Sequence, residues 1–445
     1  MTKKITKTLS IVAACFMLVA CIFLFCGCEL LGDNVYYNPN APTASNQQGK
    51  TAYDIAVENG FVGTESEWLE SLKGKSAYDI AVENGFVGTE SEWLESLKGA
   101  SGHVSVEDDR QVVANCLMSS VSLFCAKTST ATFDSAGSGV IYKYEPSTGT
   151  AIIITNYHVV YDETNKKLHN SICVLPYGSN EYILGTFVGG SAIYDIALVK
   201  VEDKSLVNNP SIKQIEIDDS LNVVVGQTAI AIGNAQGEGI SVTKGIVCVD
   251  SEDITISNVE TEVSTEIRVM RIDTAVNRGN SGGGLFGADG KLIGIVNAKI
   301  IDTDVEGIGY AIPVSIATKV AENILYYWQK GNGRVVKPVL GITIQITSSN
   351  AVFDKETNAI QIVERIDVND VAKTSPAHNL LLVGDRIVSV AKKGDSHVEV
   401  VDRIFKIKDF LLTMHQGDVL QFMVERDGAL IAIDLEITSD MLQQS

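Results

Sequence analysis

Short apolar runs separated by glycine or polar residues follow one another along most of this chain. Examples are residues 151–154, 196–199 and 229–232, each ended within a few positions by charged, amide or glycine residues. Short apolar runs bounded by turn residues are typical of β-strands. The 38 glycines and only 8 prolines also suit a strand-rich chain with many tight turns. We therefore expect a mainly β protein.

The pattern differs before residue 100, where one helical unit is repeated. Residues 53–74 and 78–99 are identical, and Tyr53 and Tyr78 mark a period of 25 positions. Each copy predicts a short helix that stops at a glycine, then a second helix that begins with a Thr-x-x-Glu capping box, at Thr64–Glu67 in the first copy. Within one unit we expect the apolar side chains of the two helices to pack together: Trp68, Leu69 and Leu72 on Ile55, Val57 and Phe61. The two repeats (51–99) are either a spacer or a docking module for a surface partner.

The first 28 residues predict export and attachment to a membrane. Three lysines precede an apolar run from Leu9 to Phe25, which is the arrangement of an export signal. Cys21 follows a segment that resembles a bacterial lipobox, whereas Cys28 lies at the end of the run, so either cysteine is a candidate for lipidation. An uncleaved signal anchor is the third option. A linker at 29–50 follows, and we expect the remainder of the chain outside the cytoplasm of a bacterial cell.

Composition limits the function classes. A chain of 445 residues predicts two or more domains. The net charge of −20 argues against nucleic acid as a partner, because phosphates require a basic surface. None of the 8 cysteines shows CxxC spacing, so we expect no metal site. Cys116 and Cys125 are either bridged to each other or buried as free thiols.

The candidate chemistry centres on Ser281, in the glycine-rich turn Gly279–Gly283 (GNSGG). A serine hydroxyl needs a base, an acid that orients the base, and N–H donors for an oxyanion. Of the six histidines, only His158 and His169 lie in the segment that can fold around the serine. His158 follows an apolar strand that we expect to continue through Val159–Val160, whereas His169 lies in a turn expected to be solvated. His158 is therefore the better candidate.

The candidate acid is Asp195, which opens the strand-like run Ile196–Val201. A lone Asp at a strand end also commonly makes a turn. Asp273 is the rival, but it is only eight positions before Ser281 and is expected to shape the loop that leads to it. The sequence therefore predicts the constellation His158, Asp195 and Ser281.

These three blocks resemble the HtrA/Deg family of chymotrypsin-fold serine proteases with PDZ domains. The resemblance rests on TNYHVV at 155–160, YDIALVKV at 194–201 and NRGNSGG at 277–283. Three further segments resemble the family in the same order along the chain: 137–141, 229–234 and 307–313. The resemblance implies a double β-barrel at 105–330 and a Ser-His-Asp endopeptidase without a cofactor. It also implies backbone N–H groups of Gly279 and Ser281 as the oxyanion hole.

The resemblance implies partners as well. These are unfolded or damaged exported proteins as substrates, and homotrimers formed through the protease domain. The pocket before the cut would lie near Ala275 and residues 295–299, where Lys299 would alter a family preference for aliphatic residues. Gly284 stands where the family usually carries Pro or Ala, and we expect it to add backbone freedom beside the nucleophile.

The C-terminal region at 335–440 resembles a PDZ domain, a small α+β fold. Leu340, Gly341 and Ile342 look like its carboxylate-binding loop, and residues 375–378 look like a PDZ helix. The resemblance implies that C-terminal peptides add as a strand to an exposed edge. Residues 331–333 (GNG) predict a flexible joint before it. Two other functions stay open: a peptide-binding chaperone without hydrolysis, and a surface adhesin that acts through its repeats.

Overall fold

The computed structural model describes residues 51–72, 78, 82, 85–91, 93, 109–127, 133–218, 223–257, 260–261, 264–300, 307–355 and 358–444. The chain divides into two compact units, Met1–Gly102 and His103–Ser445. The predicted export signal, with Cys21 and Cys28, and the linker at 29–50 lie outside the described residues. Among the residues that are described, none of the helices combines the length and apolar character needed to cross a bilayer.

The smaller unit contains the first repeat as two helices, α2 (Ala52–Glu58) and α3 (Glu65–Leu72). The predicted capping box is present, since Thr64 N donates to Glu67 Oε2 at 2.6 Å and Glu67 N donates to Thr64 Oγ1 at 3.3 Å. The packing differs from the prediction. Tyr53 contacts Phe61 and Trp68, whereas Ile55, Val57 and Leu69 are among the exposed side chains. Two short helices bury too little surface to cover every apolar residue.

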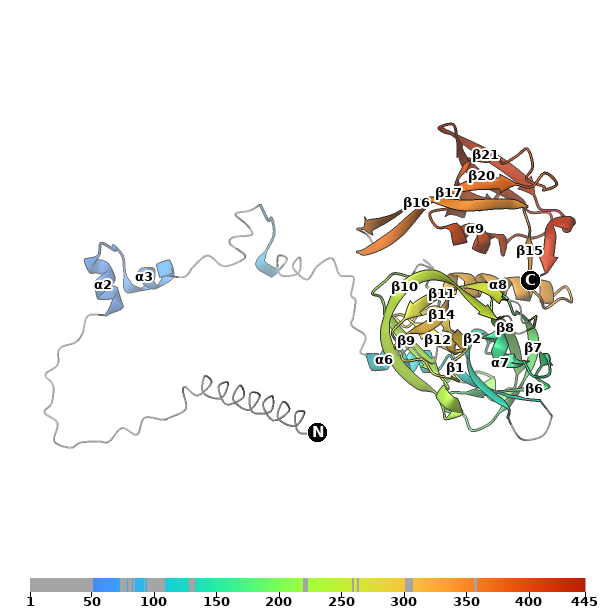
Figure 1. Ribbon diagram of the computed structural model, residues 1–445. Helices are drawn as coiled ribbons and strands as arrows, with labels where there is room; N and C mark the ends of the chain where they lie inside the picture. Colours follow the sequence, from blue (N-terminus) through green and yellow to red (C-terminus); the bar gives the residue numbers. More distant parts are fainter. Residues whose placement is uncertain are drawn as a thin grey trace, which may run out of the picture. The chain divides into compact units, whose positions relative to one another are not determined.

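Two closed six-stranded barrels form most of the larger unit (Figure 1). In order around the first barrel, the strands are β1 (Ser120–Ala126), β2 (Ser135–Glu145), β3 (Thr150–Thr155), β8 (Ile196–Glu202), β7 (Ile183–Ser191) and β6 (Ser171–Pro176). Around the second they are β10 (Ser241–Ser257), β11 (Ser264–Ile272), β14 (Gly309–Pro313), β13 (Leu292–Val296), β12 (Gly284–Phe286) and β9 (Thr228–Gly233). All pairings within the barrels are antiparallel, which defines a chymotrypsin-like fold.

The alternation seen in the sequence explains the barrels. Strand β6 buries every second residue, and Ile172 and Val174 point into the first barrel. Strand β13 is buried along its whole length because the helix α8 (Val314–Trp328) covers it from outside. The short helix α6 (Asp109–Leu117) adds Val112 and Cys116 to the same core. Minor elements are the hairpin of β4 (Tyr161–Asp162) and β5 (Lys167–Leu168) and the 3₁₀ turns η1 (Lys204–Leu206) and η2 (Ala235–Gly237).

A separate sheet forms the C-terminal domain. Its strands are β16 (Ile342–Asp354), β17 (Ala359–Val371), β18 (Arg386–Lys392), β20 (Val419–Arg426) and β21 (Ala429–Glu436), in that spatial order, with β19 (Val398–Val400) beside β18. The helix α9 (Ile404–Leu411) packs on this sheet. After the 3₁₀ turn η4 (Ser439–Met441), β22 (Leu442–Gln444) pairs with β15 (Val336–Pro338) and so returns the chain to the start of the domain.

Two predictions for this region were wrong. Residues 375–378 form turns, and the helix of the domain is α9. The predicted joint is also not free, because Gly190 N donates to Gly333 O at 2.9 Å on strand β7. A Cβ at Gly189 would lie 2.1 Å from that oxygen, so glycine is required for the close approach. The joint is packed against the first barrel.

Polar contacts in the interior hold the C-terminal domain to the barrels. Arg268 on β11 forms an ion pair with Asp409 on α9, and both side chains are buried. The Arg268 guanidinium also donates a hydrogen bond to Ser315 Oγ at 3.0 Å and lies over the Phe405 ring. Asn323 on α8 donates to the backbone oxygens of Val336 and Leu412. These contacts leave little freedom between the domains.

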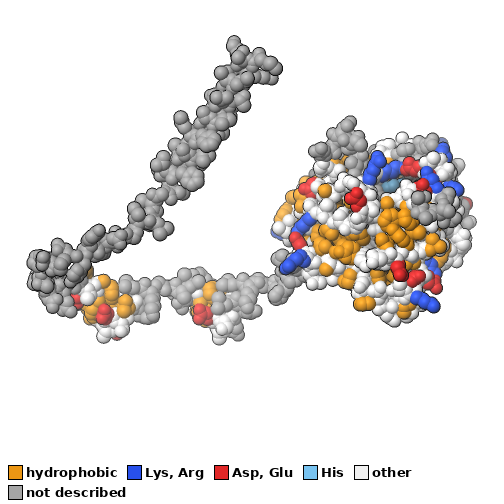
Figure 2. Space-filling view, turned by 90° about the horizontal axis from the view of Figure 1, so that it is seen from below, with side chains coloured by type: hydrophobic (Ala, Val, Ile, Leu, Met, Phe, Trp, Pro, Cys, Tyr) orange, Lys and Arg blue, Asp and Glu red, His pale blue; other side chains and the backbone are white. Residues whose placement is uncertain are grey.

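Hydrophobic side chains also reach the surface. In Figure 2 they gather over the middle of the face shown of the larger unit, with charged side chains around them. The exposed rings of Phe133 and Tyr182 form an aromatic cluster with the half-buried Phe124 on the first barrel, with ring centroids 5.2 to 5.5 Å apart. Exposed apolar patches commonly mark interaction surfaces.

Removing the acid of the buried pair tests its importance for stability. We expect Asp409→Asn to lower the free energy of unfolding by about 3–5 kcal/mol, because Arg268 then stays buried without a counter-charge. Urea unfolding followed by circular dichroism measures the change. The control is Asp434→Asn, in the exposed pair with Lys393, where we expect little change in the free energy of unfolding because water screens the pair. Equal losses in the two variants would contradict the assignment.

Candidate active site

His158 lies in α7 (Tyr157–Val160), a single helical turn that follows β3 of the first barrel. The predicted continuation of the strand was wrong, since β3 ends at Thr155 and the helical turn buries Val159 and Val160. Asn156 begins the turn, and its Nδ2 donates to the Asp195 backbone oxygen at 2.9 Å. The turn thereby holds His158 beside Asp195.

Asp195 occupies the turn between β7 and β8, directly before Ile196 as predicted. Its φ of +49° is in the left-handed region, which costs free energy for a residue other than glycine. The buried carboxylate accepts three hydrogen bonds: from His158 N at 2.9 Å, from His158 Nδ1 at 2.7 Å and from Asn297 Nδ2 at 2.8 Å. Three N–H donors stabilise the ionised carboxylate in this position.

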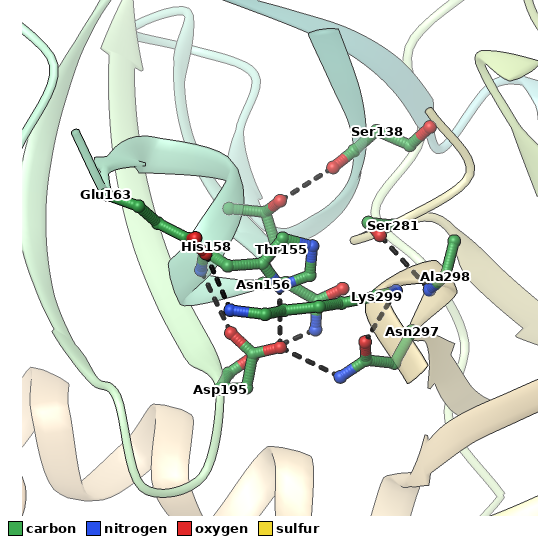
Figure 3. A network of polar contacts seen from close by, with 10 residues as sticks. All are labelled: Ser138, Thr155, Asn156, His158, Glu163, Asp195, Ser281, Asn297, Ala298 and Lys299. Carbon is green, nitrogen blue, oxygen red and sulfur yellow. Dashed lines mark hydrogen bonds and ion pairs between the residues drawn. The ribbon is translucent and has the colours of Figure 1, made fainter. Parts of the chain in front are cut away.

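The tautomer of His158 follows from this contact. An ionised carboxylate is only an acceptor, so Nδ1 carries the proton and Nε2 of the neutral ring is free to accept one. Figure 3 shows the imidazole between the Asp195 carboxylate and Ser281. The structure therefore brings all three predicted residues into one site, from two different barrels.

Ser281 lies in a buried turn whose glycines are required by close contacts. Gly279 and Gly282 have φ of +96° and +82°. A Cβ would lie 2.2 Å from Asn234 O at Gly279 and 2.1 Å from Thr155 Oγ1 at Gly282. The turn therefore follows the GNSGG pattern because side chains at these two positions would collide with neighbouring strands.

Ser138 on β2 holds the nucleophile turn against the first barrel. Its N–H donates to Ser281 O at 2.8 Å, and its hydroxyl donates to Gly279 O at 2.7 Å. The same hydroxyl accepts a hydrogen bond from Asn234 N, and the backbone oxygen of Ser138 accepts one from Thr155 Oγ1, both at 2.7 Å. This residue was only part of a matching segment in the sequence, and its role depends on contacts between strands far apart in the chain.

Among the described residues, the Ser281 hydroxyl has a hydrogen-bond partner, whereas two backbone amides of the same turn have none. Ser281 Oγ accepts a hydrogen bond from Ala298 N at 3.1 Å, and within the described residues no hydrogen bond joins it to His158. In the same part of the chain, the N–H groups of Gly279 and Ser281 donate to no protein acceptor. Two unpaired amides beside a serine hydroxyl are what an oxyanion requires.

Asn297 was not among the site residues predicted from the sequence. It is fully buried, and besides its bond to Asp195 its side-chain oxygen accepts from Lys299 N at 3.2 Å. The one available signal was its place as a polar residue directly after the apolar strand β13. An amide there needs a partner when buried, but the sequence does not say which partner it meets.

The rejected candidates lie elsewhere. Asp273 Oδ1 accepts from Ile246 N at 2.6 Å, which fits the prediction that it shapes a loop. His169 is buried rather than solvated, and burial lowers the pKa of its imidazole. Burial also raises the pKa of the Cys116 and Cys125 thiols to about 12, so both stay protonated. Of the two options predicted for these cysteines, a mutual disulfide or free thiols, the structure has free thiols.

Two expectations about the pocket need correction. Ile295 and Val296 are fully buried in the second barrel, so only Ala275 and Lys299 of the expected lining are exposed. Gly284 adds no freedom, because it is buried and paired within β12. A Cβ at this position would lie 2.2 Å from the Phe286 ring, so glycine makes room for a core side chain.

In the C-terminal domain, the predicted carboxylate loop precedes the edge strand β16. Gly341 has φ of +66°, and Ile342 begins the strand. Among the described residues, the amides of Leu340 and Gly341 donate to no protein acceptor. In the part of the chain that the structure describes, β16 pairs with β17 alone, so its other edge is open next to α9.

Comparison with known proteins agrees with this geometry. A family model described as a trypsin-like peptidase domain matches residues 137–295. The structure of an HtrA-type protease, AlgW with tripeptide, has a TM-score of 0.50 at 24% identity and covers 75% of this chain and 97% of that one. At this identity the likeness concerns the fold. Together with the double barrel and the site, it defines a serine peptidase of the chymotrypsin type.

Sequence relatives define the family more closely. The chain is 32% identical over 322 residues to the serine protease Do-like HtrA of Bacillus subtilis, covering 70% of this chain and 66% of the relative. It is 31% identical over 252 residues to a serine protease HtrA-like protein of Staphylococcus aureus, covering 54% of this chain and 30% of that relative. The chain belongs to the HtrA/Deg family. It spans about two thirds of the first relative and less than a third of the second.

The contact between Asn297 and Asp195 can be tested kinetically. We expect Asn297→Ala to lower kcat about ten- to hundredfold with little change in KM, because a hydrogen bond to a charged group contributes about 1.5–3 kcal/mol. Peptide hydrolysis at several substrate concentrations measures both constants. Asn180→Ala, at an exposed position between β6 and β7, is the control. An unchanged kcat in Asn297→Ala would contradict the role.

Proposed function

We propose that this protein is a serine endopeptidase that cleaves unfolded or damaged exported proteins outside the cytoplasm. One observation carries the proposal. An imidazole that Asp195 orients at 2.7 Å lies beside a serine whose turn leaves two amides unpaired. The membership of the HtrA/Deg family supports the same activity, and the substrate class follows from that resemblance.

The chemistry follows from the positions of the groups. The Ser281 hydroxyl leaves the Ala298 amide and turns to His158, whose free Nε2 takes the proton as Ser281 attacks a peptide carbonyl. Asp195 stabilises the imidazolium. The amides of Gly279 and Ser281 receive the oxyanion, and His158 then protonates the leaving amine. Water resolves the acyl-enzyme with His158 again as the base.

Hydrolysis of an unstructured protein tests the proposal directly. We expect the full chain to degrade fluorescent casein and Ser281→Ala to lose this activity. Asp195→Asn should lower kcat about 10⁴-fold, as in the corresponding change of the serine protease template. Release of fluorescence measures the rates, and Ser205→Ala, at an exposed position of the 3₁₀ turn η1, is the control.

A second function has one observation in its favour. The Ser281 hydroxyl is bonded to Ala298 and not to His158, which is the arrangement of an inactive site. A peptide-binding chaperone would suppress aggregation equally well in wild type and Ser281→Ala, with no cleavage by either. That result, obtained also in the presence of C-terminal peptides, would replace the endopeptidase.

We also propose that the C-terminal domain is a PDZ domain that binds the C-terminal ends of peptides. The support is the open edge of β16 and the unpaired amides of Leu340 and Gly341 before it. A peptide would pair with β16, and its carboxylate would accept hydrogen bonds from these amides and that of Ile342.

Capping the peptide carboxylate tests this assignment. Fluorescence anisotropy should detect binding of labelled apolar peptides with a free C-terminus, and amidation should weaken it at least about tenfold, since a charge-assisted hydrogen bond is lost. Gly341→Ala should weaken binding as well, because its Cβ would lie 2.4 Å from Ser375 Cβ. Equal binding of free and amidated peptides would contradict carboxylate capture.

Location and assembly complete the proposal. We propose attachment to the bacterial membrane through the N-terminus, by lipidation of Cys21 or Cys28 or by a signal anchor, as the apolar run before them suggests. Homotrimers follow from the family resemblance, and the aromatic cluster of Phe124, Phe133 and Tyr182 is an apolar surface available for such contacts. The repeats remain a spacer or a docking module, with Ile55 and Val62 exposed.

A further inference from the structure

An ion pair crosses the site between the two barrels. Lys299 Nζ lies 2.6 Å from Glu163 Oε1. Glu163 belongs to the turn between β4 and β5 in the first barrel, and Lys299 lies in η3 (Ala298–Ile300), after β13 of the second. Figure 3 shows the Lys299 side chain extending past Asn297 toward Glu163, beside His158 and Asp195.

The backbone of Lys299 belongs to the segment that contacts the reacting groups. Asn297 donates to Asp195, Ala298 N donates to Ser281 Oγ, and Lys299 N donates to Asn297 Oδ1. A peptide bound along this segment would therefore meet the Lys299 side chain, one residue after the amide that holds Ser281 Oγ.

The pair itself is weak and exchangeable. The side chains of Lys299 and Glu163 are 27% and 55% exposed, and water screens ion pairs at such exposure, so they contribute little to stability. Within the described residues, neither charged group makes another hydrogen bond or ion pair. A charged side chain of a substrate can therefore replace either partner at little cost.

The charge balance of the site decides which partner is replaced. Asp195 and Glu163 are negative and Lys299 is positive, so the imidazolium formed during catalysis brings the four groups to neutrality. A basic substrate side chain would pair with Glu163 and leave Lys299 facing the new imidazolium. An acidic one would pair with Lys299 and leave Glu163 near the imidazolium, which is attractive.

We propose that Lys299 is a specificity-determining residue that selects substrates with an acidic side chain close to the cleaved bond, by exchanging Glu163 for the substrate carboxylate. This inference rests on the proposed endopeptidase activity. It adds a charge preference to the aliphatic one that the family implies. In the free protein Glu163 occupies the place on Lys299 that the substrate carboxylate would take.

Matched peptides test the inference. Peptides that carry Glu, Gln or Lys at each of the three positions before the cut are compared by kcat/KM with the full chain. At one of these positions we expect wild type to favour Glu over Lys about three- to tenfold, as two exposed charge contacts allow. Lys299→Met should remove the preference and Lys299→Glu should reverse it. Because the contacts are exposed, 0.5 M NaCl should reduce the preference.

Controls separate charge from structure. Lys200→Met removes the same charge from an ion pair of similar exposure on β8, with Glu202 at 3.0 Å, and should keep the wild-type preference. Equal kcat/KM for Glu and Lys peptides in wild type, or an equal fall for all peptides in Lys299→Met, would overturn this inference but not the proposed endopeptidase activity. Failure of wild type to cleave casein and every peptide would overturn the proposed endopeptidase, and this inference with it.

Discussion

The close approach of the two barrels at Ser138 is the constraint on which the site depends. Four hydrogen bonds converge on this residue, from or to Ser281, Gly279, Asn234 and Thr155. The approach is possible because Gly282 has no Cβ, which would otherwise lie 2.1 Å from Thr155 Oγ1. Fixing the nucleophile turn to β2 and β3 fixes its distance from α7, and so from His158. A larger residue at Gly282 would separate the barrels.

In this site the acid and the base have the hydrogen bonds that catalysis requires, but the nucleophile does not. Asp195 has three donors and His158 one defined tautomer, whereas the Ser281 hydroxyl is held by the Ala298 amide. In the proposed reaction the Ser281 hydroxyl must therefore leave the Ala298 amide before it can donate to His158. The segment 297–299 therefore combines support of Asp195, restraint of Ser281 and presentation of the Lys299 charge.

The packing of the C-terminal domain connects the edge proposed to bind peptides with the two barrels. The helix α9 borders the open edge of β16 and also carries Asp409, whose ion pair with Arg268 is buried in the second barrel. Because the joint at Gly333 is packed on β7, the domain is not a freely moving attachment. A peptide that displaced α9 would have to disturb a buried charge pair.

The sequence by itself determined the candidate residues for the chemistry and the strands at 151–154, 196–201 and 229–232. The GNSGG turn, the strand that Asp195 opens and the small number of histidines limited the candidates to His158, Asp195 and Ser281, because these signals are local. What the sequence could not determine depends on neighbours distant in the chain. His169 is buried, Gly284 makes room for Phe286, and the joint at Gly333 packs on β7. The contacts of Asn297 and Ser138, and the pairing of Lys299 with Glu163, could not be predicted either. They form only when the two barrels pack together, since burial and hydrogen-bond partners are properties of the packed structure.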